Sequence, residues 1–467
     1  MAERLTLHPD RLFPADPAAR PIARELYGQV ARLPILSPHG HTDPRWFADN
    51  EPFQDPAALL ITPDHYVFRM LYSQGIPLEA VGLGERGERD PRKIWRTFAD
   101  HYRLFRGTPS RLWLDWVFGE AFGIEVKLSA ETAEHYYDRI EAALATEAFR
   151  PRALFDRYGI EVLATTESPL DPLDDHRAIR ESGWNGRVIT AYRPDPVVDP
   201  EYEGFRANVA AFGDLTGEDT LSWRGYLAAH RKRRSFFAEM GATSTDHGHP
   251  TAGTANLGDA EAEALFHRVT KGSASPEDAE RFRAQMLTEM AAMSLDDGLV
   301  MQIHPGAARN HNPLVFENYG RDKGADIPTR TDYVHALKPL LDRFGNEPRL
   351  TIILFTLDES VYSRELAPLA GHYPALRLGP PWWFHDSPEG MRRFREEATE
   401  TAGFYNTVGF NDDTRAFLSI PARHDVARRM DCGFLARLVA EHRIEIDEAA
   451  ELARELAYGL AKRAYKL

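Results

Sequence analysis

The chain has 467 residues, 43% of them hydrophobic, which is enough for one large core or two ordinary ones. Lys and Arg number 56 against 71 Asp and Glu, and the resulting net charge of -15 disfavours a nucleic-acid partner. The single cysteine, Cys432, excludes an intrachain disulfide and a thiolate-rich zinc site. The N-terminal segment lacks secretory features, and no apolar run approaches the roughly 18 residues of a membrane helix. We therefore expect a cytoplasmic protein with no membrane partner.

The first part of the chain predicts a helix that leads into a short strand. Ile22, Leu26 and Val30 follow a helical spacing, and the apolar run Leu33 to Leu36 reads as the first strand of a segment over residues 1–44. Residues 45–158 then look almost wholly helical, with stripes of aromatic residues that indicate helix core. This stretch is too long for an ordinary connection. We expect a helical insertion after the first strand, folded over the mouth of the main domain.

Short apolar runs alternate regularly with helices over residues 159–421. Together with Leu33 to Leu36, these runs give eight predicted strands, the others lying at 160–166, 187–193, 242–246, 299–304, 350–357, 375–379 and 405–410. Such an alternation is the signature of a (β/α)8 TIM barrel, an α/β fold. Residues 422–467 are predicted to form extra C-terminal helices that pack on the outside of the barrel.

Polar and aromatic residues gather where the predicted strands end. Barrels of this kind place their active sites at the carboxyl ends of the strands. The residues at these ends are His39, His41, Thr166, Glu167, Arg193, Asp195, Asp246, His247, His304, Asp358, Trp382, Trp383, Asp413 and Arg415. The concentration exceeds what turns require and indicates an active site. For His247, a structural role in a turn and a role in the site are equally open.

The first and last of these strand ends predict a metal site. His39 and His41 are two residues apart on an extended backbone, so their imidazoles project from the same side. With Asp413 after the eighth strand, they offer three ligands to one divalent metal ion, for which Zn²⁺ is our expectation. His304 is expected nearby as an acid-base or hydrogen-bonding group.

Several separate stretches resemble the uronate isomerase family, also called glucuronate isomerase, within the amidohydrolase superfamily of metal-dependent barrels. In chain order they are His39–His41, Asp64–Tyr66, Thr165–Asp171, Tyr192–Asp195, His304–Asn310, Trp382–Asp386 and Asp413–Ser419. Binuclear hydrolases of that superfamily carry a lysine after the fourth strand and a histidine after the sixth. Here the fourth strand ends in Asp246-His247 and the sixth in Leu357-Asp358. A single metal ion is therefore expected.

The resemblance implies isomerisation of D-glucuronate to D-fructuronate and of D-galacturonate to D-tagaturonate. Moving a hydrogen between C2 and C1 needs a base, an acid and stabilisation of an enediolate. The catalytic candidates are Asp413, Tyr66, His65 and His41. Only the resemblance brings His65 and Tyr66 into the site, because both lie in the helical insertion. The candidates for binding the substrate are Arg193 and Arg415, which can hold a carboxylate, together with His304, Arg309, Trp382 and Trp383.

Two other functions compete with this interpretation. A metal-dependent hydrolase of amide or ester bonds is disfavoured by the missing lysine and sixth-strand histidine. A sugar-acid-binding protein without enzymatic activity is disfavoured by the intact histidines, terminal aspartate and arginines. The expected partner is a small hexuronate, and homo-oligomerisation is left open because no interface can be read from the sequence.

Overall fold

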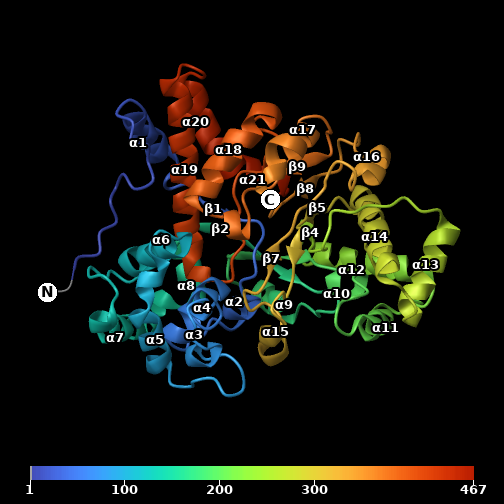
Figure 1. The fold of residues 1–467 in the computed structure, drawn as a ribbon, viewed down its shortest axis with the longest axis horizontal. Helices are drawn as coiled ribbons and strands as arrows, with labels where there is room; N and C mark the ends of the chain where they lie inside the picture. The colour runs from blue at the N-terminus through green and yellow to red at the C-terminus, as the bar shows by residue number, and fades with distance from the viewer. Residues whose placement is uncertain (1–2) are drawn as a thin grey trace.

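The computed structural model describes residues 3–467, so the predicted N-terminal segment is described from residue 3 onward. Its centre is a curled parallel sheet of seven strands in the order β1-β2-β3-β4-β5-β8-β9, surrounded by helices (Figure 1). The strands are β1 (Ile35–Ser37), β2 (Ile160–Glu167), β3 (Arg187–Tyr192), β4 (Ser244–His247), β5 (Val300–Ile303), β8 (Ile352–Leu354) and β9 (Leu376–Leu378). The predicted strands before residue 380 are therefore confirmed, several of them with shorter bounds.

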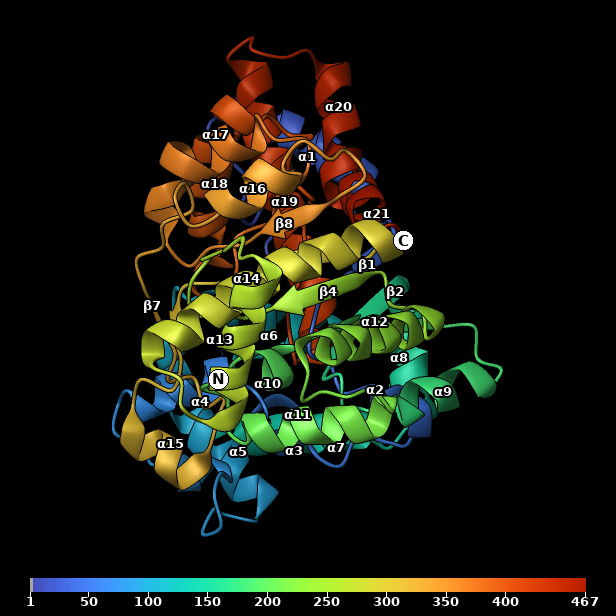
Figure 2. The same cartoon turned by 90° about the vertical axis from the view of Figure 1, so that its right-hand side faces the viewer.

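Helices connect successive strands, because parallel pairing requires a crossover. They are α9 (Asp174–Glu181), α10 (Asp195–Val198), α11 (Phe205–Thr216), α12 (Trp223–Glu239), α13 (Asp259–Lys271), α14 (Pro276–Asp297), α15 (Pro313–Tyr319), α16 (Lys338–Phe344), α17 (Ala367–Ala370) and α18 (Pro388–Ala402). Helix α12 packs against β3, and α14 packs against β5. Figure 2 shows these two helices on either side of β4. A small antiparallel pair, β6 (Ala307–Ala308) with β7 (Ile327–Pro328), lies in the long connection after β5.

The predicted eighth strand at 405–410 is present only as a single parallel bridge between Thr407 and Leu378. The prediction was too long because the backbone turns at Gly409, where φ is 75°. A Cβ atom there would lie 2.7 Å from the carbonyl oxygen of Leu456, so the close approach of the C-terminal segment also requires glycine. Farther along, the Asp412 carboxylate accepts a hydrogen bond of 3.1 Å from the Ser37 hydroxyl of β1. This segment thus contacts both edge strands of the sheet.

The stretch between β1 and β2 is helical, as the sequence predicts. It contains α2 (Pro44–Asp49), α3 (Pro56–Leu60), α4 (His65–Tyr72), α5 (Pro91–Asp100), α6 (Pro109–Trp116), α7 (Ala133–Leu144) and α8 (Pro151–Arg157). Asp55, Asp64 and Asp90 accept backbone N–H groups at the starts of α3, α4 and α5. The aromatic stripe is core, as expected: Trp95, for example, is 1% exposed and donates to the Ala133 carbonyl.

The C-terminal part forms α19 (Ile420–Ala440), α20 (Ile446–Arg454) and α21 (Leu460–Ala464). Helices α19 and α20 pack against the N-terminal α1 (Ala19–Val30), so the two ends of the chain share one hydrophobic cluster. Helix α19 is buried along most of its length. Among residues 3–467, no helix is long and apolar enough to cross a membrane.

Tyr465, which directly follows α21, is fully buried and inserts into a cluster with Val300, Ile353 and Val408. Its hydroxyl donates to the Gln302 amide oxygen at 2.9 Å and accepts from the Asn411 amide at 3.2 Å. The C-terminus thereby connects β5 to the segment that follows the predicted eighth strand.

We predict that Tyr465→Phe lowers the free energy of unfolding by about 1–3 kcal/mol, because two buried amides lose a partner. Chemical denaturation monitored by circular dichroism measures the effect. The matched control is Tyr405→Phe, whose hydroxyl binds Glu451 at the surface and whose loss should cost less than about 0.5 kcal/mol. Equal effects of the two variants would contradict the prediction.

Candidate active site

A cavity of about 350 Å³ opens at the carboxyl ends of the sheet strands. All of the site residues predicted from the sequence line it: His39, His41, His65, Tyr66, Arg193, His304, Arg309, Trp382, Trp383, Asp413 and Arg415. They come from the connections that follow sheet strands, from α4 in the helical stretch and from the segment after the predicted eighth strand. The fold thus brings together residues from both ends of the chain.

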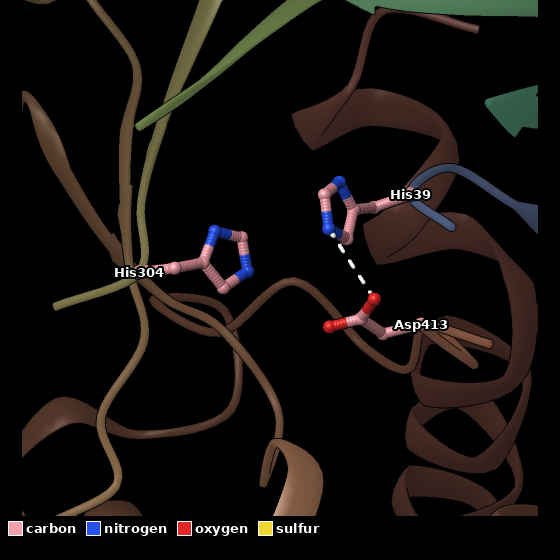
Figure 3. A group of neighbouring side chains, drawn as sticks. All are labelled: His39, His304 and Asp413. Carbon is pink, nitrogen blue, oxygen red and sulfur yellow. Dashed lines mark ion pairs between the residues drawn. The ribbon is translucent and has the colours of Figure 1, made fainter. Parts of the chain in front are cut away.

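Three of these residues form a cluster with the geometry of a metal site. Ligand atoms of His39, His304 and Asp413 all lie within 4.8 Å of one another, and Figure 3 shows the three side chains converging. His39 Nε2 is 3.5 Å from Asp413 Oδ1, and the rings of His39 and His304 stack with centroids 4.7 Å apart. His304 Nε2 and His39 Nδ1 are buried without a hydrogen-bond partner. Two imidazoles grouped with a carboxylate are a donor set that suits a divalent cation.

His41 lies at the edge of this cluster. Its Nε2 is 3.3 Å from Asp413 Oδ1, but it is not among the three residues whose ligand atoms group most tightly. The sequence predicted His39, His41 and Asp413 as the ligands and placed His304 beside them. In the structure His304 belongs to the tight group, because it directly follows β5 and its ring stacks on that of His39.

Asp413 occupies a strained backbone position. Its φ is 37°, in the left-handed region that aspartate tolerates better than most residues. The neighbouring Thr414 carbonyl accepts a hydrogen bond from the His41 backbone N–H. Burial by itself would raise the pKa of Asp413, but His39 and a hydrogen bond from His41 hold it well below its usual value.

Asp246 at the end of β4 supports the cluster from behind. It is fully buried, and its two oxygens bind His304 Nδ1 at 2.7 Å and Arg193 Nη1 at 2.9 Å. A second carboxylate, that of Asp195, binds Arg193 Nε at 2.9 Å. The bond to Asp246 fixes the ring of His304 and leaves its Nε2 facing the cavity. The sequence had marked Asp246 as a strand-end residue, but gave no reason to assign it this function.

The other two predicted arginines each pair with an acid on the connection after β5. Arg415 binds Asp322 at 3.0 Å, and Arg309 binds Asp326 at 3.1 Å. Arg321 also lines the cavity, and its guanidinium lies 4.4 Å from the ring centroid of Tyr202. The sequence analysis missed Arg321, Asp322 and Tyr202, since no strand end or family motif marks them.

Aromatic side chains form a further wall of the cavity. The ring of His65 stacks on Tyr66 at 4.8 Å and meets Trp383 edge-on at 5.2 Å. Burial lowers the pKa of His65 to about 3 and raises that of Tyr66, so both side chains are neutral near pH 7. Trp382 and Trp383 both face the cavity, and Trp383 has a φ of 50°, a strained value for so large a residue.

His247 is the strand-end residue for which the sequence left two roles open. Its Nε2 bonds the Thr245 hydroxyl at 3.0 Å, it is fully buried, and it does not line the cavity. Its Nδ1 is buried without a hydrogen-bond partner, so both alternatives for this residue stay predictions.

A family model described as glucuronate isomerase matches residues 18–465. The chain belongs to the glucuronate isomerase family. A uronate isomerase of Sphingopyxis alaskensis is 72% identical, and the match covers 100% of both chains. The crystal structure of glucuronate isomerase from Caulobacter crescentus has a TM-score of 0.98 at 66% identity, covering 99% of this chain and 98% of that chain. The resemblance read from the sequence motifs is confirmed.

The family fold persists at much lower identity. The crystal structure of a uronate isomerase from Thermotoga maritima is 28% identical, has a TM-score of 0.92, and is matched over 98% of this chain and 99% of that chain. Membership of an isomerase family also decides between the two enzyme classes left by the sequence: it supports the isomerase and not the hydrolase.

Beside the cavity, the carboxyl group of Glu167 is enclosed at the end of β2. Hydroxyls of Thr165 and Thr190 donate to its Oε2, and His176 of α9 bonds the same Thr165 hydroxyl at 2.8 Å. Burial raises the pKa of Glu167 to about 8, and the negative charge of Asp171 adds to the shift. Burial lowers the pKa of His176 to about 4, so this ring is neutral above pH 5.

We predict that Glu167→Gln, which mimics the protonated acid, makes the protein more stable than wild type at alkaline pH. A raised pKa in the folded state gives wild type its full stability below about pH 4.5, and that contribution is lost as the pH rises through about 8. Melting temperatures of both proteins from pH 5 to pH 9 measure the effect. The two should differ little at pH 5 and most at pH 9; parallel curves would contradict the prediction.

Proposed function

We propose that this chain is a uronate isomerase that interconverts D-glucuronate with D-fructuronate and D-galacturonate with D-tagaturonate at the cavity described above. The observation that carries the proposal is the convergence of all predicted site residues on one cavity in a chain of this family. The relatives named uronate isomerase match over the full length, which supports the same chemistry here.

We propose that the segment from 405 to 414 completes a (β/α)8 barrel. Its contacts with β9 and with β1 support closure, although hydrogen bonding is too sparse for a regular strand. In this view residues 1–44 supply a helix and the first strand, 45–158 form a helical wall at the barrel mouth, 159–421 complete the barrel, and 422–467 pack outside it. The presence of His65 and Tyr66 in the cavity lining supports this place for the wall.

The proposed cofactor is one divalent metal ion, with Zn²⁺ as the expected species. His39 and Asp413 would hold it, with a third ligand from His304 or His41, both of which lie beside Asp413 or His39. When bound, the ion supplies Lewis acidity that stabilises negative charge on a substrate oxygen.

The proposed acid and base are two cavity residues in opposite protonation states. Asp413 is the base: its Oδ1 lies 3.5 Å from His39 Nε2 and 3.3 Å from His41 Nε2, and the residue lines the cavity. Tyr66 is the acid, because its buried phenol stays protonated and can donate to an oxygen as negative charge develops on it. His65 is uncharged and can orient a substrate hydroxyl by hydrogen bonding. Asp413 would take the proton from C2 while Tyr66 donates its proton to O1, which gives an enediol. Asp413 would then return its proton to C1 while the O2 hydroxyl gives its proton to the Tyr66 phenolate, which leaves the ketone at C2 and restores both side chains.

The arginines divide between support and substrate binding. Arg193 pairs with two carboxylates and is thereby neutralised, so we assign it to orienting Asp246 and His304. Arg309 and Arg415 have one carboxylate partner each and retain donors for the substrate carboxylate. Trp382 and Trp383 would pack against the sugar ring.

The first test is ketouronate formation from D-glucuronate and D-galacturonate, followed by NMR. We predict that Asp413→Asn lowers kcat/KM by at least about 10²–10⁴-fold, since a general base contributes that much and the substitution also weakens a proposed metal ligand. The control is Asp447→Asn at an exposed position of α20, which should leave activity unchanged. Absence of ketouronate from folded, metal-loaded wild type would refute the proposed function.

A second prediction separates metal binding from proton transfer. His39→Asn should lower both the metal content and turnover, because it removes a cluster nitrogen. Tyr66→Phe should keep the metal and lower kcat by about 10²-fold or more, because it removes only the proposed acid. Elemental analysis and kinetics on the same preparations measure both. Metal loss in Tyr66→Phe, or full metal content in His39→Asn, would contradict the assignments.

A further inference from the structure

A buried arginine of α19 lies directly behind the cavity wall that carries Tyr66. Arg423 is 1% exposed and is held at three points. Its Nη1 donates to Asp386 Oδ2 at 2.5 Å and to the Asp412 carbonyl at 3.4 Å, and its Nε donates to the Ser419 hydroxyl at 3.0 Å. These partners fix the guanidinium beside the segment that leads into Asp413.

The faces of this guanidinium are covered by aromatic rings from the helical insertion. Its central carbon lies 3.5 Å from the ring centroid of Trp113 and 5.4 Å from that of Tyr66. The two rings meet edge-on at 5.7 Å. A cation over an aromatic ring within about 6 Å is attracted to it, most strongly when both are removed from water. Arg423 therefore connects α4 and α6 of the insertion to the segment after the predicted eighth strand.

Stability alone is a poor explanation for this arrangement. Removing a guanidinium and a carboxylate from water is costly, and a buried ion pair often stabilises a fold no more than apolar residues of similar size would. Asp386 Oδ1 is, moreover, buried without a hydrogen-bond partner. The pair of Arg423 and Asp386 fixes the position of a planar cation. Tyr66 lies between this cation and the cavity.

We propose that Arg423, anchored by Asp386, is a positioning residue for the isomerisation: it holds Tyr66 at the cavity wall in register with Asp413. This inference rests on the proposed function, in which Tyr66 is the acid. Arg423 lines no part of the cavity and acts only through Tyr66. The same contacts tie the insertion to the segment that leads into Asp413, so the acid and the base, which come from distant parts of the chain, share one support.

The test uses Arg423→Lys, which keeps the charge but loses the planar fork and its stacking. We expect kcat to fall by about tenfold or more, with KM changed less than about threefold, because substrate binding groups are untouched while the acid is misplaced. In a Tyr66→Phe background the same substitution should have little further effect on kcat, since the hydroxyl that it positions is absent. Asp386→Asn, which removes the anchor, should reproduce the kcat loss and serves if the lysine variant fails to fold.

The matched control is Arg428→Lys on the same helix. Arg428 is also buried, but it donates to the carbonyls of Ala31, Leu33 and Pro34, away from the cavity. This variant should lower the melting temperature and leave kcat unchanged. The proposal is overturned if Arg423→Lys and Asp386→Asn lose stability as Arg428→Lys does but retain kcat. It is also overturned if the Arg423 and Tyr66 effects multiply in the double variant.

The experiments distinguish failure of the proposed function from failure of the positioning role of Arg423. If wild type forms no ketouronate, the proposed function is refuted and this inference with it. If wild type is active and Tyr66→Phe retains full kcat, the isomerase function stands, whereas Tyr66 is not the acid and a positioning role for Arg423 is excluded.

Discussion

The structure depends on the junction between the end of β1 and the segment at 411–414. The Ser37 hydroxyl donates to Asp412 across 375 positions of sequence, and the His41 backbone N–H donates to the Thr414 carbonyl. This junction places His39 beside Asp413. The same segment pairs with the opposite edge of the sheet at an earlier residue, through the bridge between Thr407 and Leu378 of β9. One set of contacts therefore serves both the architecture and the site.

Around this junction, the charged side chains of the cavity are paired with groups of opposite charge. Each arginine predicted to bind substrate has a carboxylate partner within hydrogen-bonding distance, and Asp246 joins Arg193 to His304. Cations concentrated in a partly dry pocket would otherwise repel one another and lose much hydration energy. The acids lower that cost and fix the orientation of each guanidinium. Substrate then enters a site whose polar groups are already in place, which reduces the reorganisation that the reaction requires.

The helical insertion and α19 extend this organisation beyond the sheet. Tyr66 comes from α4, Trp113 from α6, and Arg423 from α19, and all three meet behind the cavity. Helix α19 is buried on several sides because it lies between the sheet, the insertion and α1. Its polar residues consequently find partners inside the protein, as His424 does at 3.1 Å from Asp412.

The sequence by itself determined the periodic elements and the chemistry of the strand ends. Apolar runs of strand length predicted eight strands, seven of which form the sheet. Polar residues after these runs predicted His39, Arg193, His304 and Asp413, because parallel strands align their carboxyl ends. For Tyr66 the pattern alone indicated only a helical residue, and family resemblance was needed. The tertiary structure decided the rest. The irregular eighth segment, the place of His304 beside His39 and Asp413, and the loop acid Asp322 all depend on contacts between distant segments, which leave no periodic signal in sequence. Arg423 shows the same limit: within α19 it is one helical arginine among several, and only packing distinguishes it from Arg428.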